Sequence, residues 1–297
     1  MKLKECQKNP AALCAKRFKN KFNSTIYKQF RKLILKKINR LLFVLLFLIQ
    51  PFTHAQIITN AKNDILQVLN MGGDLATSLT SFNNTKDWDI AGTVTAIGIG
   101  YSLDNSFHSF SQRNVTPLDS RIFSIDNIYG SGYTLYGIAG IYGYGLFFNN
   151  PEVRKIGVQT IEAVGYAGVI TSILKSLIGR SRPYTYKDKA DFHPFNTHAA
   201  ETSFPSGHST VAFAMSTVLA NNTNNIFLKI LCYSSAGWVA CSRIYHNAHW
   251  TSDVIAGGAI GYFVGNFVTN NYDNNSKSNS GLSFHYSMDS LGITYSF

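Results

Sequence analysis

Hydrophobic residues recur at intervals of three and four over much of the chain after residue 55, which is the spacing of one face of an α-helix. This pattern predicts helices over residues 64–79, 133–148, 158–178, 209–220, 227–241 and 253–268. The Gly- and Thr-rich stretch 90–103 fits a short helix or a strand, and residues 104–126 have the composition of a loop. The dominant pattern is that of an all-α domain.

Two polar stretches and the C-terminal end break this pattern. Residues 183–204 predict a polar loop, of a length that is usually functional or disordered. Residues 270–280 are rich in Asn and Ser and predict a linker. From Leu282 to Phe297, apolar residues alternate with small or polar ones, which predicts a short C-terminal β-hairpin.

Hydropathy along the chain favours a soluble or peripheral domain over one with several membrane spans. The longest apolar run after residue 55 covers about 15 residues, Val254–Val268. A spanning helix needs about 20.

The positive charge of the chain is concentrated at its beginning. Of 27 Lys and Arg residues, 13 lie in residues 1–55 beside a single acidic residue, Glu5, which leaves 14 basic and 15 acidic residues in 56–297. The net charge of +11 therefore does not indicate a basic binding face, and no nucleic-acid partner is expected.

The leader has the order of a secretory signal peptide. A basic stretch ends at Arg40, the short apolar run Leu41–Ile49 follows, and small residues lead to Ala55. A retained N-terminal anchor is the alternative. We expect a leader with a signal peptide or anchor over 1–55, a helical domain over 56–270, and a linker with a β-hairpin tail over 271–297. The domain would be exported, to the periplasm or to the membrane of the cell envelope.

The cysteines do not predict a disulfide framework or a metal site. Cys232 and Cys241, which follow the leader, would lie about 13 Å apart on one helix, too far to form a disulfide. No clustered Cys/His spacing indicates zinc. The sequence predicts no cofactor and no metal.

Three short segments supply the groups needed to hold and cleave a phosphate ester. In chain order, the residues concerned are Lys175, Arg182, Ser206, Gly207, His208, Arg243, His249 and Asp253. A phosphoryl group in transfer spreads negative charge over its non-bridging oxygens, so it needs cations and hydrogen-bond donors around it. The lysine and the two arginines supply positive charge, the serine a hydroxyl, and the glycine exposed backbone N–H groups at a helix start.

The two histidines supply a nucleophile and an acid without a metal ion. His249 and Asp253 are four residues apart and share one face of a helix. The carboxylate can orient one ring nitrogen while the other attacks phosphorus. His208 would protonate the leaving alcohol and then activate the water that hydrolyses the phosphohistidine.

These segments resemble the type 2 phosphatidic acid phosphatase superfamily, which includes bacterial class A acid phosphatases and vanadium haloperoxidases. Its pattern, K-x6-RP, PSGH and SR-x5-H-x3-D, is matched at every fixed position between Lys175 and Asp253. The resemblance implies a helical bundle with the site at one end. It also implies His208 as acid, His249 as nucleophile and Asp253 as the orienting group. The residues that it implies for phosphate binding are Lys175, Arg182, Ser206, Gly207 and Arg243.

The substrate stays open at this point. Apolar, Gly-rich helices favour lipid phosphates such as phosphatidic acid, a polyprenyl diphosphate or a lipid A type, with a membrane surface as partner. The lack of full-length spans favours a broad-specificity periplasmic acid phosphatase on small esters. A vanadate-dependent haloperoxidase and a catalytically silent envelope protein are further alternatives.

Two nearby residues carry weaker predictions. Arg180 is expected to be a surface charge, with a second phosphate ligand as the alternative, and His246 could line the pocket.

Overall fold

The structure is a computed structural model that describes residues 56–77, 84–113, 122–278, 282–287 and 290–295. The chain divides into two units, 1–60 and 61–297, and the second contains the helical domain. The predictions about the leader concern residues 1–55, which lie outside the described residues.

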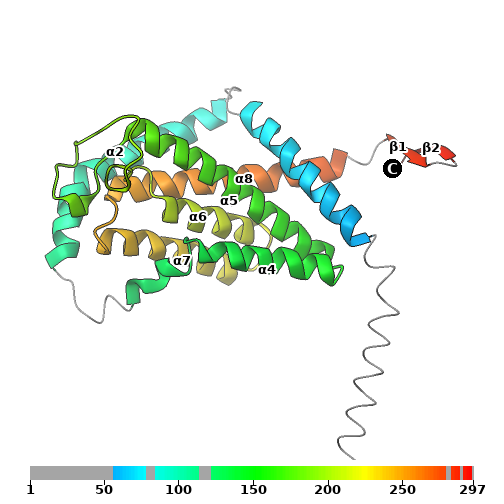
Figure 1. Ribbon diagram of the computed structural model, residues 1–297, viewed down its shortest axis with the longest axis horizontal. Coiled ribbons are helices and arrows are strands. Elements are labelled where there is room, and N and C mark those ends of the chain that lie inside the picture. Colours follow the sequence, from blue (N-terminus) through cyan, green and yellow to red (C-terminus); the bar gives the residue numbers. More distant parts are fainter. Residues whose placement is uncertain (1–55, 78–83, 114–121, 279–281, 288–289, 296–297) are drawn as a thin grey trace, which may run out of the picture. The chain divides into compact units, whose positions relative to one another are not determined.

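The domain is built from helices, as the hydrophobic pattern predicts (Figure 1). Residues 61–77 are helical, and the further helices are α2 (Asn84–Arg113), α4 (Tyr133–Phe147), α5 (Pro151–Ile178), α6 (Gly207–Asn221), α7 (Ile226–Tyr245) and α8 (Thr251–Ser278). Short 3₁₀ helices are η1 (Phe123–Asn127), η2 (Pro183–Thr185) and η3 (Ala199–Glu201). The all-α prediction is confirmed for this domain.

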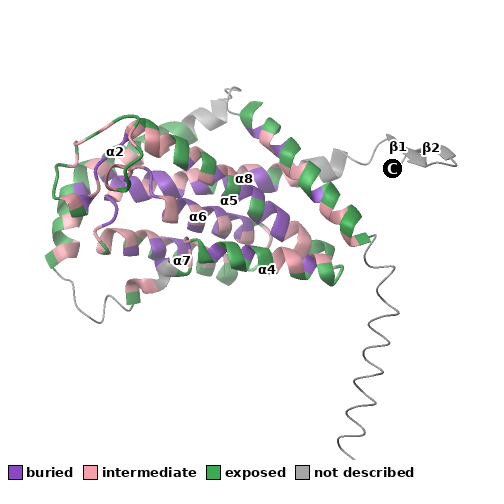
Figure 2. Ribbon diagram, viewed as in Figure 1, coloured by how far each residue is buried: buried purple, intermediate pink, exposed green. Residues whose placement is uncertain are grey.

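The central helix of the bundle is α6, which contacts α5, α7 and α8. Ala214 and Val218 on α6 are completely buried in the main core cluster, with Ala167 of α5 and Val268 of α8. Figure 2 shows the buried positions concentrated along α6 and on the inner faces of its neighbours. Small side chains in the core let the helices approach closely.

The helix connections bring four helix ends to one end of the bundle. The loop 179–206 joins the end of α5 to the start of α6, and residues 246–250 join the end of α7 to the start of α8. A backbone hydrogen bond from Ser206 N to Asp253 O, 2.9 Å long, ties the start of α6 to the start of α8. All three predicted motif segments lie at these ends.

The boundaries of α5 follow from local sequence. The Asn150 side chain caps its first turn by accepting a hydrogen bond from Val153 N, and Pro151 occupies the first turn. Gly179 ends the helix at φ 63°. A Cβ at this position would collide with the His193 carbonyl oxygen, so glycine also admits the close approach of the following loop.

The polar loop 179–206 is an ordered part of the structure. Its two ends are joined by a hydrogen bond from Ser203 N to Arg180 O (2.8 Å), and His193 N donates to Gly179 O (2.7 Å). These bonds fix the residues that follow α5 beside those that precede α6.

Two helices are longer than predicted. Residues 104–113 belong to α2 and do not form a loop, because Asp104 is completely buried and paired within the bundle. Helix α8 continues to Ser278, so the linker predicted for 270–280 is wrong over most of its length. Contacts beyond Val268 hold this extension, since Asn221 Nδ2 donates to Thr269 Oγ1 (2.8 Å) and Lys155 lies over the Tyr272 ring.

Strands β1 (Leu282–Ser287) and β2 (Ser290–Tyr295) pair antiparallel, with Leu282 opposite Tyr295. The residues that connect them, 288–289, lie outside the described residues. The C-terminal β-hairpin therefore stays a prediction.

The prediction of no spanning-length helix is wrong for α5. Within the described residues, it is the one helix long and apolar enough to cross a membrane, and 28% of its most apolar window is buried. The Glu162 side chain in the middle of α5 is 1% exposed, and Lys175 lies in its last turn. Neither charge therefore interrupts the exposed apolar surface of the helix.

Candidate active site

The predicted nucleophile lies between α7 and α8, in a buried position. His249 is 3% exposed, and its Nδ1 atom lies 3.6 Å from Asp253 Oδ2 and 3.4 Å from Ser203 Oγ. Because Nδ1 is turned toward the carboxylate, Nε2 is the ring nitrogen left for attack on phosphorus. The two side chains meet as predicted, but His249 lies in the connection that precedes α8 and does not share a helix face with Asp253.

Asp253 is held in one orientation by several donors. Its Oδ2 atom accepts hydrogen bonds from Trp250 N (2.9 Å) and from Ser203 Oγ, and its Oδ1 atom accepts one from Arg180 Nη1 (2.6 Å). Burial raises the pKa of Asp253, but His249 and Arg180 beside it lower the pKa below its usual value. Asp253 is therefore ionised and able to orient the imidazole.

His249 is a neutral base in this environment. Burial lowers its pKa to about 3, and the positive charge of Lys175 acts in the same direction against the raising effect of Asp253. A neutral imidazole has a free electron pair, which a nucleophile requires.

The first two motif segments meet at the start of α6. A methyl group at Gly207 would lie 3.8 Å from Lys175 Cε, so the lysine side chain runs beside the glycine backbone. Lys175 Nζ donates to Thr202 O (2.6 Å), and Arg182 Nε donates to Ala199 O (2.7 Å). Both cations are thereby fixed to the loop 179–206.

Ser206 is the N-cap of α6, and its hydroxyl accepts a hydrogen bond from Ser209 Oγ (3.1 Å). The helix start places Ser206 and the N–H groups that follow it at the same end as His249. Aligned N–H groups at a helix start favour an anion.

Arg243 lies at the end of α7 and forms an ion pair that the sequence did not predict. Its Nη1 atom lies 2.5 Å from Asp126 Oδ2, and Asp126 is 1% exposed. His246 faces the same carboxylate at 3.8 Å and contacts the Phe123 carbonyl oxygen at 3.2 Å. Asp126 thus holds the Arg243 guanidinium at the side of the site where α7 ends.

His208 lies beside these cations. Burial, and then the positive charge of Arg243, lowers its pKa to about 4, while Asp126 raises it. His208 is therefore neutral at neutral pH, and an anionic phosphate beside it would favour its protonated form.

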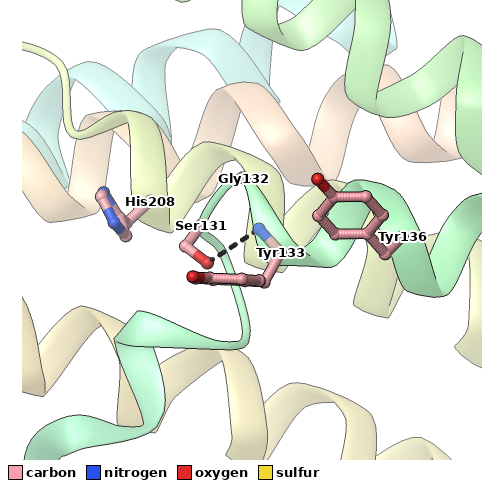
Figure 3. A pocket seen from close by; sticks show the side chains of 5 residues that line it. All are labelled: Ser131, Gly132, Tyr133, Tyr136 and His208. Carbon is pink, nitrogen blue, oxygen red and sulfur yellow. Dashed lines mark hydrogen bonds between the residues drawn. The ribbon is translucent and has the colours of Figure 1, made fainter.

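A cleft of about 590 Å³ opens at His208. Figure 3 shows His208 on one side of this cleft and Ser131 with Tyr133 and Tyr136, from the start of α4, on the other. The two tyrosine rings lie 6.2 Å apart. A group bonded to the oxygen that His208 would protonate can extend into this space.

Arg180 is not the surface charge expected from the sequence. It is 1% exposed and lies between Asp253 and Asp104, at 2.6 Å and 2.7 Å. The loop 179–206 folds back on itself at an isolated bridge between Arg180 and Phe192, which covers the guanidinium. The structure therefore places Arg180 behind the carboxylate of the site.

The structure brings together all eight residues that the motifs predict, and it adds Ser203, Asp126, Arg180 and Asp104 around them. Ser203 lies two residues before the second motif and Arg180 lies within the first, so closeness to the motifs in sequence was a usable signal for both. Asp104 and Asp126 lie far from the motifs in sequence, and no local pattern distinguishes them. The roles of the motif residues in catalysis stay predictions.

Residues 157–277 match the profile of the PAP2 superfamily. This segment belongs to that superfamily, and the predicted resemblance is confirmed.

Curated relatives of the chain are phosphatases by name. A lipid A 1-phosphatase of Rhizobium etli is 39% identical over 114 residues, which cover 37% of this chain and 47% of that protein. Phosphatidylglycerophosphatase B of Bacillus subtilis is 32% identical over 143 residues, which cover 44% of this chain and 64% of that protein. The chain spans less than half the length of the first of these relatives.

A solved structure with a similar arrangement is that of LpxE from Aquifex aeolicus, with a TM-score of 0.46 and 24% identity. The match covers 57% of this chain and 95% of that one.

Proposed function

We propose that the chain is a metal-independent phosphatase that hydrolyses lipid phosphates through a phosphohistidine formed on His249. The observation that carries this proposal is the arrangement at the joined helix ends. There the Nδ1 atom of a buried, neutral His249 faces an ionised Asp253, and Lys175, Arg182 and Arg243 line the same end of the bundle.

In the proposed reaction, His249 Nε2 forms a bond to phosphorus as the bond from phosphorus to the leaving oxygen breaks. His208 gives its proton to that oxygen. The neutral His208 then takes a proton from water, the water oxygen attacks phosphorus, and the bond to His249 breaks to release inorganic phosphate. The lysine and arginine side chains neutralise the charge on the transferring group throughout.

Exposed apolar side chains support a lipid substrate and a place in the envelope membrane. Phe147, Val169 and Phe227, on three different helices, are 69%, 58% and 78% exposed. Large exposed apolar surfaces mark membrane or protein contacts. Together with a relative named lipid A 1-phosphatase, this makes a lipid A type glycolipid phosphate the first substrate to test, for an exported, membrane-associated enzyme.

The assay that tests this function uses the purified full chain in detergent with excess EDTA. We expect release of inorganic phosphate from lipid A, phosphatidylglycerophosphate or a polyprenyl diphosphate, at the same rate as without EDTA. Loss of activity in EDTA would contradict the metal-independent mechanism. Activity confined to small esters such as p-nitrophenyl phosphate would reject the lipid substrate and favour an acid phosphatase that acts on small soluble esters. Halide-dependent peroxidase activity with added vanadate, and no phosphate release, would assign the site to the haloperoxidase alternative.

The pKa values of the two histidines predict an acidic pH dependence. His208 must be protonated to act as the acid, and its pKa is lowered to about 4, so its protonated fraction rises as the pH falls. His249 has a pKa of about 3 and stays neutral above pH 5. We therefore expect kcat/KM for an alkyl phosphate to rise from pH 8 to pH 5, by up to about tenfold per pH unit.

Two substrates separate this effect from ionisation of the substrate itself. A p-nitrophenolate group leaves without a proton, so His208→Asn should lower kcat/KM for p-nitrophenyl phosphate much less than for an alkyl phosphate. Equal losses on both substrates would exclude His208 as the acid.

A further inference from the structure

Arg180 lies at the centre of a buried charge network that the proposed reaction does not yet use. Its Nη1 atom donates to Asp253 Oδ1 (2.6 Å) and its Nη2 atom to Asp104 Oδ2 (2.7 Å), while its Nε atom donates to Lys189 O (2.8 Å). Each nitrogen of the guanidinium therefore has a fixed partner. These partners turn the guanidinium toward the two carboxylates.

Aromatic rings seal the same guanidinium from solvent. The rings of Tyr101, Phe192 and Trp250 lie 5.2, 5.8 and 5.3 Å from its central carbon. Stacking of this kind stabilises a desolvated cation. Arg180 is 1% exposed, and its guanidinium reaches the predicted catalytic residues through Asp253.

Asp104 anchors the other side of the network and the start of α8. Its Oδ1 atom accepts from Ser252 N (2.9 Å) and its Oδ2 atom from Ser252 Oγ (2.7 Å). Ser252 Oγ also accepts from Arg180 Nη1 (2.7 Å). Asp104 therefore fixes both the guanidinium and the backbone next to Asp253.

The charges in this network match a cationic intermediate. Asp104 and Asp253 carry two negative charges and Arg180 one positive charge, so the cluster has a net charge of −1. Attack through Nε2 converts neutral His249 into a cationic ring whose Nδ1–H faces Asp253. The positive charge of that ring would neutralise the net charge of −1 on the cluster of Asp104, Arg180 and Asp253.

We infer that Arg180 and Asp104 are positioning residues, which fix the rotation and the charge of the Asp253 carboxylate so that it orients Nδ1–H of His249. This inference rests on the proposed phosphohistidine mechanism. It assigns Arg180 no contact with the substrate phosphate.

The test replaces the pair together, because removal of Arg180 alone would leave two buried carboxylates without a cation and could prevent folding. The double variant Asp104→Asn/Arg180→Gln keeps the net charge of the cluster at −1. We expect kcat for phosphate release to fall about 10²-fold, whereas KM and the inhibition constant of inorganic phosphate change by less than about threefold. The single variant Arg180→Lys keeps the positive charge but cannot hold both carboxylates. Its kcat should therefore lie between that of the wild type and that of the double variant.

A matched control is available on α5. Arg154 pairs with Asp64 at 3.6 Å and is 25% exposed, so Arg154→Gln should leave kcat and KM unchanged. A folded double variant with unchanged kcat would overturn the inference. So would parallel increases in KM and in the phosphate inhibition constant, since these would make Arg180 a phosphate ligand.

Nitrogen NMR of the His249 ring tests the inference without relying on turnover. We expect the Nδ1–H tautomer in the wild-type protein and a mixture of tautomers in the double variant. An unchanged tautomer would reject the positioning role. Wild-type protein that is inactive on every substrate would reject the proposed function, while the tautomer would still decide the role of Arg180 and Asp104.

Discussion

Replacing His249 by Gln is expected to lower kcat for phosphate release by about 10³-fold or more, since this variant keeps a polar side chain but removes the atom that bonds to phosphorus. The surrounding cations remain, so binding of inorganic phosphate should change little. Steady-state kinetics with the lipid substrate and with p-nitrophenyl phosphate would measure both quantities.

His193 offers a matched control. It is a histidine of the loop 179–206, its side chain is 38% exposed, and it pairs with Asp191 at 2.9 Å. Exposed pairs of this kind contribute little to stability, so His193→Gln should keep kcat within about twofold. A His249→Gln variant that retained kcat within about tenfold of wild type would rule out the phosphohistidine, although the lipid substrate could still be correct.

The intermediate can also be trapped directly. In His208→Asn, the good leaving group of p-nitrophenyl phosphate departs without an acid, whereas the water that cleaves the phosphohistidine lacks its base. Labelled phosphate should therefore accumulate on the protein, in an acid-labile bond to His249. Absence of label on a variant that still releases p-nitrophenolate in a burst would contradict this sequence of steps.

The motif residues could be placed from the sequence because each lies at a helix end. Lys175 lies in the last turn of α5, Gly207 begins α6, and Arg243 lies in the last turn of α7. Helices joined in antiparallel succession bring alternate ends together, so correct helix assignment and motif spacing were enough to predict where the site lies.

The network behind Asp253 could not be predicted in the same way. Arg180 and Asp104 are 76 residues apart, and each looks like a solvated charge in its own segment. Asp104 also lies among Asn, Ser and His residues that favour a loop, whereas burial in the bundle holds them in α2. Only the folded chain reveals that these two charges neutralise each other.

The prediction that no helix reaches spanning length failed for α5 for a related reason. Counting uninterrupted apolar residues treats Glu162 as an interruption of α5, but this side chain faces the interior of the bundle and is 1% exposed. Outward positions of the same helix, such as Val169 and Ile173, are apolar and more than half exposed. The direction of a charge, which a linear count ignores, decides whether a helix can face lipid.

Replacing Gly257 by Ala is expected to cost both folding stability and activity. Gly257 lies in α8 against the start of α6, where an added Cβ would collide with the Ser206 carbonyl oxygen and lie 3.1 Å from Thr210 Oγ1. That carbonyl already accepts hydrogen bonds from Thr210 N and Thr210 Oγ1, each 3.0 Å long. The backbone there cannot give way without displacing Ser206 and the residues after it.

We expect the overpacking to destabilise the protein by about 1–3 kcal/mol and to lower kcat/KM, because the second motif would move relative to His249. Thermal unfolding in detergent and phosphate release would measure the two effects. Gly237→Ala in α7 is the control, since a Cβ there meets no atom within 4 Å. That variant should be neutral or more stable by up to about 1 kcal/mol, because alanine favours the helix. If Gly257→Ala and Gly237→Ala were equally stable and active, the close packing of Gly257 against the Ser206 carbonyl would not be required for the geometry of the site.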